Sequence, residues 1–432
     1  MTAPTTAMPA SPATAATATA TATASATASA TRAAPAARRG PLSRFTVLDA
    51  SRVRAGPTAV RLFADLGARV IKLEIPPGAP GGDDMIGGRD HNRADYENLH
   101  RNKESLTLNM KAPEGREILQ ALVRRADVFI ENYRPDVKYR LGIGPEDLRA
   151  VNPRLVYASI SGFGQDGPYA GWPGFDSIAQ GMGGLMSVTG QPGAGPMRVG
   201  IPIADLCAGH FCSQAILAAL LEREATGEGQ WVQTSLLEAQ IAMLDFQAAQ
   251  WLIDRKVPGQ NGNEHPLTVP TGVFATQDGY LNVAAIGQTM WVRLCQALEV
   301  PELVDEPGFG SDPERVANRA RVNAAIGAAF ARRSTAEWTE RLLKAGVPCG
   351  PIHRIDQVFD DPQVRHLGVA WPMAHPEVGD VALVAPPMRF SAHPREAPPR
   401  PAPHQGDQTD AILHELGYSD QRIAELRAAI VV

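Results

Sequence analysis

The sequence is poor in cysteine, and this limits the kinds of site that it can build. Four cysteines among 432 residues are too few and too scattered for a disulfide framework or a zinc knuckle. Cys207, His210 and Cys212 form the one group that could bind a metal, but no second Cys/His pair accompanies them. Because the group lies in an alanine-rich stretch, buried small residues explain it better. We therefore expect no metal site.

The sequence also lacks an excess of basic charge and a long apolar run. Its 41 basic and 46 acidic residues give a net charge of −5, without the basic stripe that a nucleic-acid groove needs. Nucleic acid is therefore not expected as a partner. Since no apolar run approaches the length that a membrane span requires, we expect a soluble protein without a membrane partner.

The first 41 residues contain no acidic residue and no leucine, isoleucine, valine or aromatic residue. Such a segment cannot build a core, so we interpret residues 1–41 as a disordered low-complexity leader, or as sequence upstream of the true start. The leader has no apolar centre, which excludes a secretory signal, but three arginines in an acid-free context leave an organellar transit peptide open. We expect a cytoplasmic protein, or an organellar matrix protein if the leader is a transit peptide.

Beyond the leader, alternating strand and helix patterns predict an α/β fold. Residues 45–48 read as a strand, 58–66 as a helix and 69–74 as a second strand, which makes a parallel βαβ unit. The chain is longer than one core usually supports, and 44% apolar residues can fill two. We predict a large domain with a Rossmann-like parallel sheet and a smaller α+β domain. The predicted ranges are 42–225 for the first part of the large domain, 226–345 for a linker helix and the small domain, and 346–432 for a return segment completing the large domain.

The second half of the sequence contains two long helical patterns. One follows Trp231-Val232-Gln233 and continues through Ile253, and the other extends from Asp312 to Arg332. A hairpin is predicted over 272–285, around Gln277-Asp278-Gly279.

An NAD-binding site is disfavoured in spite of the Rossmann-like pattern. Glu74 at the end of the second strand is suited to bind a ribose. However, the first turn reads Ser51 to Pro57 without the GxGxxG fingerprint that lets a pyrophosphate approach the backbone.

Asp205 is a lone carboxylate within the apolar run 199–206, directly before an alanine-rich stretch that reads as a buried helix. At the first turn of a helix, the positive end of the macrodipole and the free N–H groups favour its ionised form. A nucleophilic carboxylate can be held in this way. The alternative is an ordinary helix N-cap, because aspartate is a preferred capping residue.

Several short motifs, taken together and in order, make residues 45–432 resemble the class III CoA-transferase family (CaiB/BaiF type). This family includes formyl-CoA transferase, carnitine CoA-transferase and α-methylacyl-CoA racemase. The motifs include Ala55-Gly56-Pro57, Leu66-Gly67-Ala68, Arg101-Asn102-Lys103, Glu131-Asn132-Tyr133, Ser161-Gly162-Phe163-Gly164, Ala204-Asp205 and Leu413-His414-Glu415-Leu416-Gly417.

The resemblance implies a CoA-transferase in which Asp205 is the nucleophile. The donor acyl-CoA would acylate Asp205 to a mixed anhydride, and the released thiolate would convert it to an aspartyl-CoA thioester. An acceptor acid would then leave as the new acyl-CoA. The resemblance further implies no tightly bound cofactor, with coenzyme A thioesters and carboxylic acids as substrates, and an interlaced, ring-like homodimer.

The same resemblance places coenzyme A against Lys111, Asn132, Tyr133 and Arg140, whose cations and polar groups suit its phosphates and arm. For Arg140, surface solvation is an equal alternative. Ile75 departs from the family, several members of which have an arginine there. Gly262 belongs to a Gly259–Asn263 loop that resembles the family's mobile loop covering the site, the alternative being a plain surface linker.

Three further residues bear on the reaction and its substrate. In the racemase branch a histidine precedes the aspartate equivalent to Asp176, but here the residue is Phe175, which cannot shuttle a proton. Asp176 is expected either to orient groups beside the nucleophile or to cap a helix. An acyl-CoA racemase or isomerase with Asp205 as base remains the alternative function. Arg54 could clamp a second carboxylate and select dicarboxylic acids such as succinate, or it could pair with acids of its own domain.

Overall fold

The computed structural model describes residues 40–80, 93–395 and 398–432. The predicted disordered leader lies outside the described residues, apart from its last two positions.

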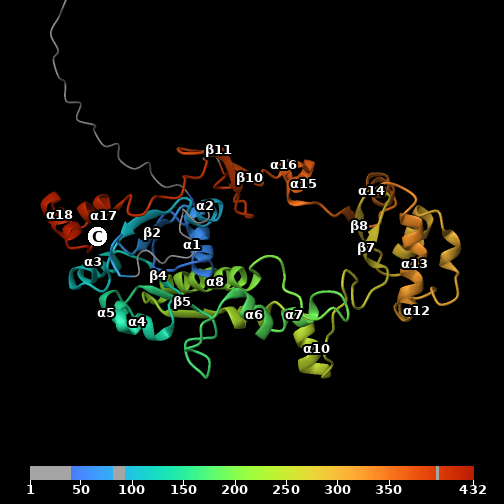
Figure 1. Ribbon diagram of the computed structural model, residues 1–432, viewed down its shortest axis with the longest axis horizontal. Coiled ribbons are helices and arrows are strands. Elements are labelled where there is room, and N and C mark those ends of the chain that lie inside the picture. The colour runs from blue at the N-terminus through green and yellow to red at the C-terminus, as the bar shows by residue number, and fades with distance from the viewer. Residues whose placement is uncertain (1–39, 81–92, 396–397) are drawn as a thin grey trace, which may run out of the picture. The chain divides into compact units, whose positions relative to one another are not determined.

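A six-stranded parallel sheet organises most of the chain (Figure 1). Its strands are β1 (Thr46–Asp49), β2 (Arg69–Glu74), β3 (Glu104–Thr107), β4 (Val128–Glu131), β5 (Val156–Ser161) and β6 (Trp231–Ser235). They are arranged in the order β3-β2-β1-β4-β5-β6, which is the order of the Rossmann fold. The predicted α/β class and Rossmann-like sheet are therefore confirmed.

Helices cover both faces of the sheet, so the side chains of its strands are buried on both sides. Val47 and Val128 belong to the core on one face, whereas Leu48 and Phe129 belong to the core on the other. The helices of the first core are α1 (Ala55–Asp65), α6 (Asp176–Met182), α8 (Ile203–Thr226) and α9 (Leu236–Ala242). Those of the second core are α3 (Pro113–Val123), α5 (Pro145–Val151), α17 (Thr409–Glu415) and α18 (Asp420–Ala428).

Helix α8 is the central helix of the first core, and it packs along α1, β5 and β6. By length and composition alone it could cross a membrane, which corrects the expectation that no segment reaches the required length. This is weak evidence of a span, because the core helix of a soluble protein has the same properties and half of its most apolar window is buried.

A second set of elements forms its own core around a three-stranded antiparallel sheet. The elements are β7 (Thr271–Ala275), β8 (Tyr280–Ala284), β9 (Cys349–Pro351), α11 (Gln288–Ala297), the 3-10 helix η1 (Pro301–Val304), α12 (Asp312–Ala317), α13 (Arg319–Phe330) and α14 (Thr335–Lys344). The hairpin predicted over 272–285 is present as β7 and β8. The sheet continues to Pro351, because β9 pairs with β8 beyond the boundary expected at 345.

The remaining described elements are shorter. They are α2 (Arg93–His100), α4 (Pro135–Leu141), α7 (Leu185–Val188), α10 (Phe246–Asp254), α15 (Ile355–Asp360), α16 (Pro362–His366) and the hairpin β10 (Ala370–His375) and β11 (Gly379–Val384).

Both long helices predicted in the second half are broken. The first divides into α9 and α10 around Asp245, whose φ of +46° is incompatible with a helix interior. The second divides at Asn318, where the side-chain amide donates to the carbonyl oxygens of Gly308 and Glu314. Apolar periodicity continues across both breaks, so it did not reveal them.

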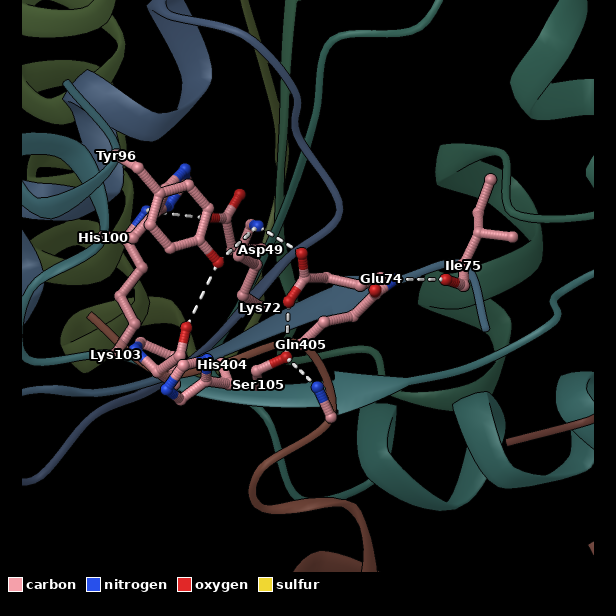
Figure 2. Close-up of polar contacts among 12 residues, drawn as sticks. Asp49, Lys72, Glu74, Ile75, Tyr96, His100, Lys103, Ser105, His404 and Gln405 are labelled. Atoms are coloured by element: carbon pink, nitrogen blue, oxygen red, sulfur yellow. Dashed lines mark hydrogen bonds and ion pairs between the residues drawn. The ribbon is translucent and has the colours of Figure 1, made fainter. Parts of the chain in front are cut away.

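A buried charge layer, formed by Asp49, Lys72, Glu74 and Lys103, lies across β1, β2 and the start of β3 (Figure 2). Lys103 contacts Asp49 at 2.9 Å, and Lys72 contacts Glu74 at 2.5 Å, so two cations balance two carboxylates. His100 accepts from Lys103 at 3.2 Å, and burial together with the nearby lysines holds its pKa well below the usual range. The layer therefore stays paired without a charged histidine.

Replacing Lys103 with methionine should lower the free energy of unfolding by about 3–5 kcal/mol, because the carboxylate of Asp49 would remain buried without its cation. Chemical denaturation measures the change, and Lys344→Met at an exposed position of α14 is the matched control. A loss below about 1 kcal/mol would show that water or another group compensates Asp49.

Candidate active site

The topological switch point of the sheet lies between β1 and β4, which are neighbours although β2 and β3 separate them in sequence. In parallel α/β sheets, ligands bind beyond the carboxyl ends of the strands at this point. The segments after β1 and β4 lie there, and the start of α8 belongs to the same edge because α8 leads into the parallel strand β6.

The loop after β1 is fixed by the side chain of Asn132, which follows β4. The Asn132 amide accepts from the backbone N–H of Arg52 at 2.8 Å and donates to the Arg52 carbonyl at 2.7 Å. Next in the loop, Val53 has a φ of +61°, an uncommon conformation for a β-branched residue. Tyr133 packs against the second core, with the Arg52 guanidinium 5.5 Å from its ring centre. Asn132 and Tyr133 therefore shape the loop that leads to Arg54.

Helices α1 and α8 approach each other closely at Gly209. A Cβ at this position would lie 2.7 Å from the carbonyl oxygen of Ala55 and 3.0 Å from the side chain of Thr58. The close contact places the start of α1, with Arg54 as its N-cap, beside the first turns of α8. The guanidinium of Arg54 is close enough to Asp205 to lower the pKa of its carboxyl group.

Asp205 is the third residue of α8 and is half-buried. Burial raises the pKa of its carboxyl group to about 6, with a further contribution from the negative charge of Asp176, while Arg54 opposes the shift. Among the described residues, none donates a hydrogen bond to this carboxylate. Asp205 is therefore not the N-cap of its helix, and it is mostly ionised at neutral pH while keeping unusual basicity for a carboxylate.

Asp176 caps α8, although it lies at the start of another helix. Its Oδ1 accepts from the backbone N–H groups of Ala204 at 2.9 Å and Asp205 at 3.3 Å. The structure thus brings the two aspartates together. Of the two roles expected for Asp176, the capping alternative referred to the helix that Asp176 itself begins, whereas the N–H groups that it contacts are 28 and 29 residues away.

Arg54 is paired within its own domain. Its Nη1 and Nη2 atoms donate to the two carboxylate oxygens of Asp95, on α2, at 3.0 and 2.7 Å. Both side chains remain about one quarter exposed, so the pair faces solvent beside Asp205. The sequence gives no signal for Asp95, because no local pattern links two residues that are 41 positions apart.

The other predicted contacts are distributed more widely. Lys111 is exposed in the turn before α3, and its Nζ donates to the Pro80 carbonyl at 3.4 Å. Arg140 is exposed on α4 and lies 3.5 Å from Asp136. Within the described residues, neither cation contacts Asp205.

The Gly259–Asn263 loop is docked on the segment that follows α7. Gln260 donates to the carbonyls of Thr189 and Gly195, both at 2.6 Å, and the Gly262 N–H donates to Gly190 at 2.9 Å. The loop lines a cavity of about 610 Å³ together with α10, and Asp205 does not line this cavity. Within the described residues, no contact places Gly262 over Asp205.

The site therefore combines a basic, weakly solvated carboxylate, a second carboxylate that orders its helix, and a nearby guanidinium. In the described parts of the chain, no three His, Cys, Asp or Glu side chains converge as a metal site. The arrangement suits covalent chemistry on Asp205.

Comparison with known proteins gives a consistent result over nearly the whole chain. The family model of CoA-transferase family III matches residues 42–409. Human succinyl-CoA:glutarate CoA-transferase is 37% identical over 396 residues, covering 91% of this chain and 90% of that protein. Succinate–glutarate CoA-transferase of Agrobacterium fabrum is 38% identical over 394 residues, covering 88% and 96%. The crystal structure of a CaiB/BaiF family protein from Brucella suis matches with a TM-score of 0.75 and 33% identity, over 88% of this chain and all of that one.

Substituting alanine for Gly209 should lower the free energy of unfolding by about 1–3 kcal/mol, because the new methyl group must push α1 away from α8. Gly327, inside α13, is the matched control, since a Cβ there meets no atom within 4 Å. Gly327→Ala should instead stabilise by about 0.5–1 kcal/mol. Equal effects of the two substitutions in denaturant titrations would contradict the close approach of the helices.

Proposed function

This chain belongs to CoA-transferase family III and is a CoA-transferase, and we propose that it transfers coenzyme A from a dicarboxylyl-CoA to a free dicarboxylic acid through Asp205. The observation that carries the proposal is the Asp205 carboxylate itself. It lies in the first turn of α8 with no hydrogen-bond donor from the described residues, and its pKa is raised to about 6. A carboxylate of this kind is a better nucleophile than a solvated one.

The reaction runs through two exchanges on the same side chain. An oxygen of Asp205 attacks the donor thioester carbonyl, the C–S bond breaks, and CoA thiolate leaves a mixed anhydride on the enzyme. The thiolate attacks the aspartyl carbonyl and expels the donor acid, which gives an aspartyl-CoA thioester. The acceptor carboxylate then repeats these steps in reverse order and departs as acyl-CoA, so Asp205 is regenerated.

The surroundings of Asp205 favour this acylation. Asp176 places a second negative charge nearby, which destabilises the ionised Asp205 and favours its conversion to an uncharged anhydride or thioester. Arg54 offsets part of that repulsion, so the carboxylate remains available as an anion at neutral pH. The balance keeps the nucleophile both ionised and reactive.

The proposed dicarboxylic substrates rest on two observations. The human and Agrobacterium relatives are named for succinate and glutarate. In this chain, Arg54 presents a planar guanidinium beside Asp205, and Asp95 already binds it with the two-point geometry that a substrate carboxylate would use. A distal substrate carboxylate would share or replace this contact.

Incubation with succinyl-CoA should give a covalent adduct on Asp205, detected by intact mass spectrometry after hydroxylamine or borohydride trapping. The rate of its formation should fall below a midpoint near pH 6, since protonation removes the nucleophile. Asp205→Asn should form no adduct. If wild type forms no adduct with a panel of acyl-CoAs but exchanges the α-proton for deuterium, Asp205 acts as a base and the racemase alternative replaces the proposal.

Arg54→Gln should reduce kcat/KM for succinate or glutarate as acceptor by roughly 10- to 100-fold, the value of one lost charge-assisted contact. Acetate or butyrate should be affected much less, because neither carries a second carboxylate. Arg61→Gln is the matched control, because it removes a cation from the same helix; the Nη1 atom of Arg61 donates to Asn98. This variant should change kcat/KM equally for mono- and dicarboxylic acids. An equal loss for mono- and dicarboxylates in Arg54→Gln would exclude the clamp.

A further inference from the structure

Gln180 lies on the same helix as Asp176 and contacts its carboxylate. Asp176 and Gln180 are four residues apart on α6, so their side chains share one face. Gln180 has no exposed surface. A buried primary amide must have its donors and acceptor satisfied, and the partners that satisfy this one all belong to the nucleophile's surroundings.

The Gln180 amide makes three contacts. Its Nε2 donates to Oδ2 of Asp176 at 2.7 Å and to the Ile201 carbonyl at 3.3 Å, while its Oε1 accepts from the Val199 N–H at 2.9 Å. One side chain therefore holds both the capping carboxylate and the backbone immediately before α8. Gln180 contacts Oδ2 of Asp176, and the other oxygen, Oδ1, caps α8.

The position of α6 is itself fixed at both ends. Before the helix, Gly174 crosses Gly162 so closely that a Cβ on Gly174 would lie 2.5 Å from the Gly162 Cα. After it, a Cβ on Gly183 would lie 2.7 Å from the side chain of Gln240, on α9. Gln180 and Asp176 thus extend from a helix that is closely packed at both ends.

We propose that Gln180 is a positioning residue for Asp205: it orients the Asp176 carboxylate toward the start of α8 and ties residues 199–201 to it. The inference rests on the proposed function only for its catalytic consequence. The N-cap of α8, Pro202, has no side-chain hydrogen bond to offer. Without Gln180, the Asp176 carboxylate loses the hydrogen bond that orients it toward α8. The backbone at Val199 and Ile201, which leads into α8, also loses its hydrogen bonds to the Gln180 amide.

Two substitutions separate the effects of Gln180. Gln180→Leu keeps the volume and removes all three hydrogen bonds; it should lower kcat by on the order of 10- to 100-fold through misplacement of the nucleophile, with KM changed less than about 3-fold. Gln180→Glu is the conservative variant. With no exposed surface and the Asp176 carboxylate as neighbour, the new carboxyl group should stay protonated, donate to Asp176 and accept from the Val199 N–H, so most of kcat should be retained.

A structural readout tests the same idea without turnover. In Gln180→Leu, hydrogen exchange followed by mass spectrometry should speed up in residues 199–206, because the Ala204 and Asp205 amides lose a well-oriented acceptor. The matched control is Gln120→Leu, the same change at an exposed position of α3, whose buried side belongs to the second core. Because this helix has no part in holding α6 or the start of α8, kcat and the exchange of 199–206 should stay at wild-type values.

The proposal is overturned if Gln180→Leu leaves both kcat and the exchange of 199–206 unchanged, or if Gln120→Leu has the same effects. Failure of the proposed function has a different signature. In that case wild type shows no Asp205 adduct, while the exchange data still report whether Gln180 orders the start of α8.

Discussion

The start of α8 requires an acceptor for its free N–H groups, and the way this need is met determines the rest of the site. The residue before the helix is Pro202, which provides no capping side chain. Asp176 supplies the acceptor from another helix. Because a carboxylate that caps its own helix is committed to that contact, the use of Asp176 as cap leaves the Asp205 carboxylate without a capping contact, as its proposed role as nucleophile requires. In the proposed mechanism, Asp176 therefore caps α8 while Asp205 acts as the nucleophile.

This division has an electrostatic consequence. A cap is most effective as an anion, so Asp176 brings a negative charge to the neighbourhood of Asp205, where burial already disfavours ionisation. Arg54 acts in the opposite sense, and its own position depends on the contact between α1 and α8 at Gly209 and on the pairing with Asp95. The basicity of Asp205 is therefore set by helix packing as much as by its immediate neighbours.

The sequence predicted the elements better than the contacts between them. Alternating apolar strands and helices predicted the parallel sheet, and the isolated carboxylate in an apolar run drew attention to Asp205. The pairing of Asp176 with α8, and of Arg54 with Asp95, joins residues about 30 to 40 positions apart, for which no local periodicity exists. Asn132 illustrates the same limit: its residue type suits a ligand contact, but its amide is used by the backbone of Arg52.

The end of β2 shows why the Rossmann strand order does not by itself determine a ligand. In dinucleotide-binding proteins an acid at this position binds a ribose. Here one oxygen of Glu74 accepts from Lys72 and the other from Ser105, and the C-terminal segment lies against the strand end, where Gln405 donates to the Ile75 carbonyl at 2.7 Å (Figure 2). Since both carboxylate oxygens are buried and paired, a ribose could bind Glu74 only by breaking the charge layer. The missing glycine fingerprint and the paired acid thus agree in disfavouring a dinucleotide at this strand end. The residues of the proposed site lie instead after β1 and β4 and at the start of α8.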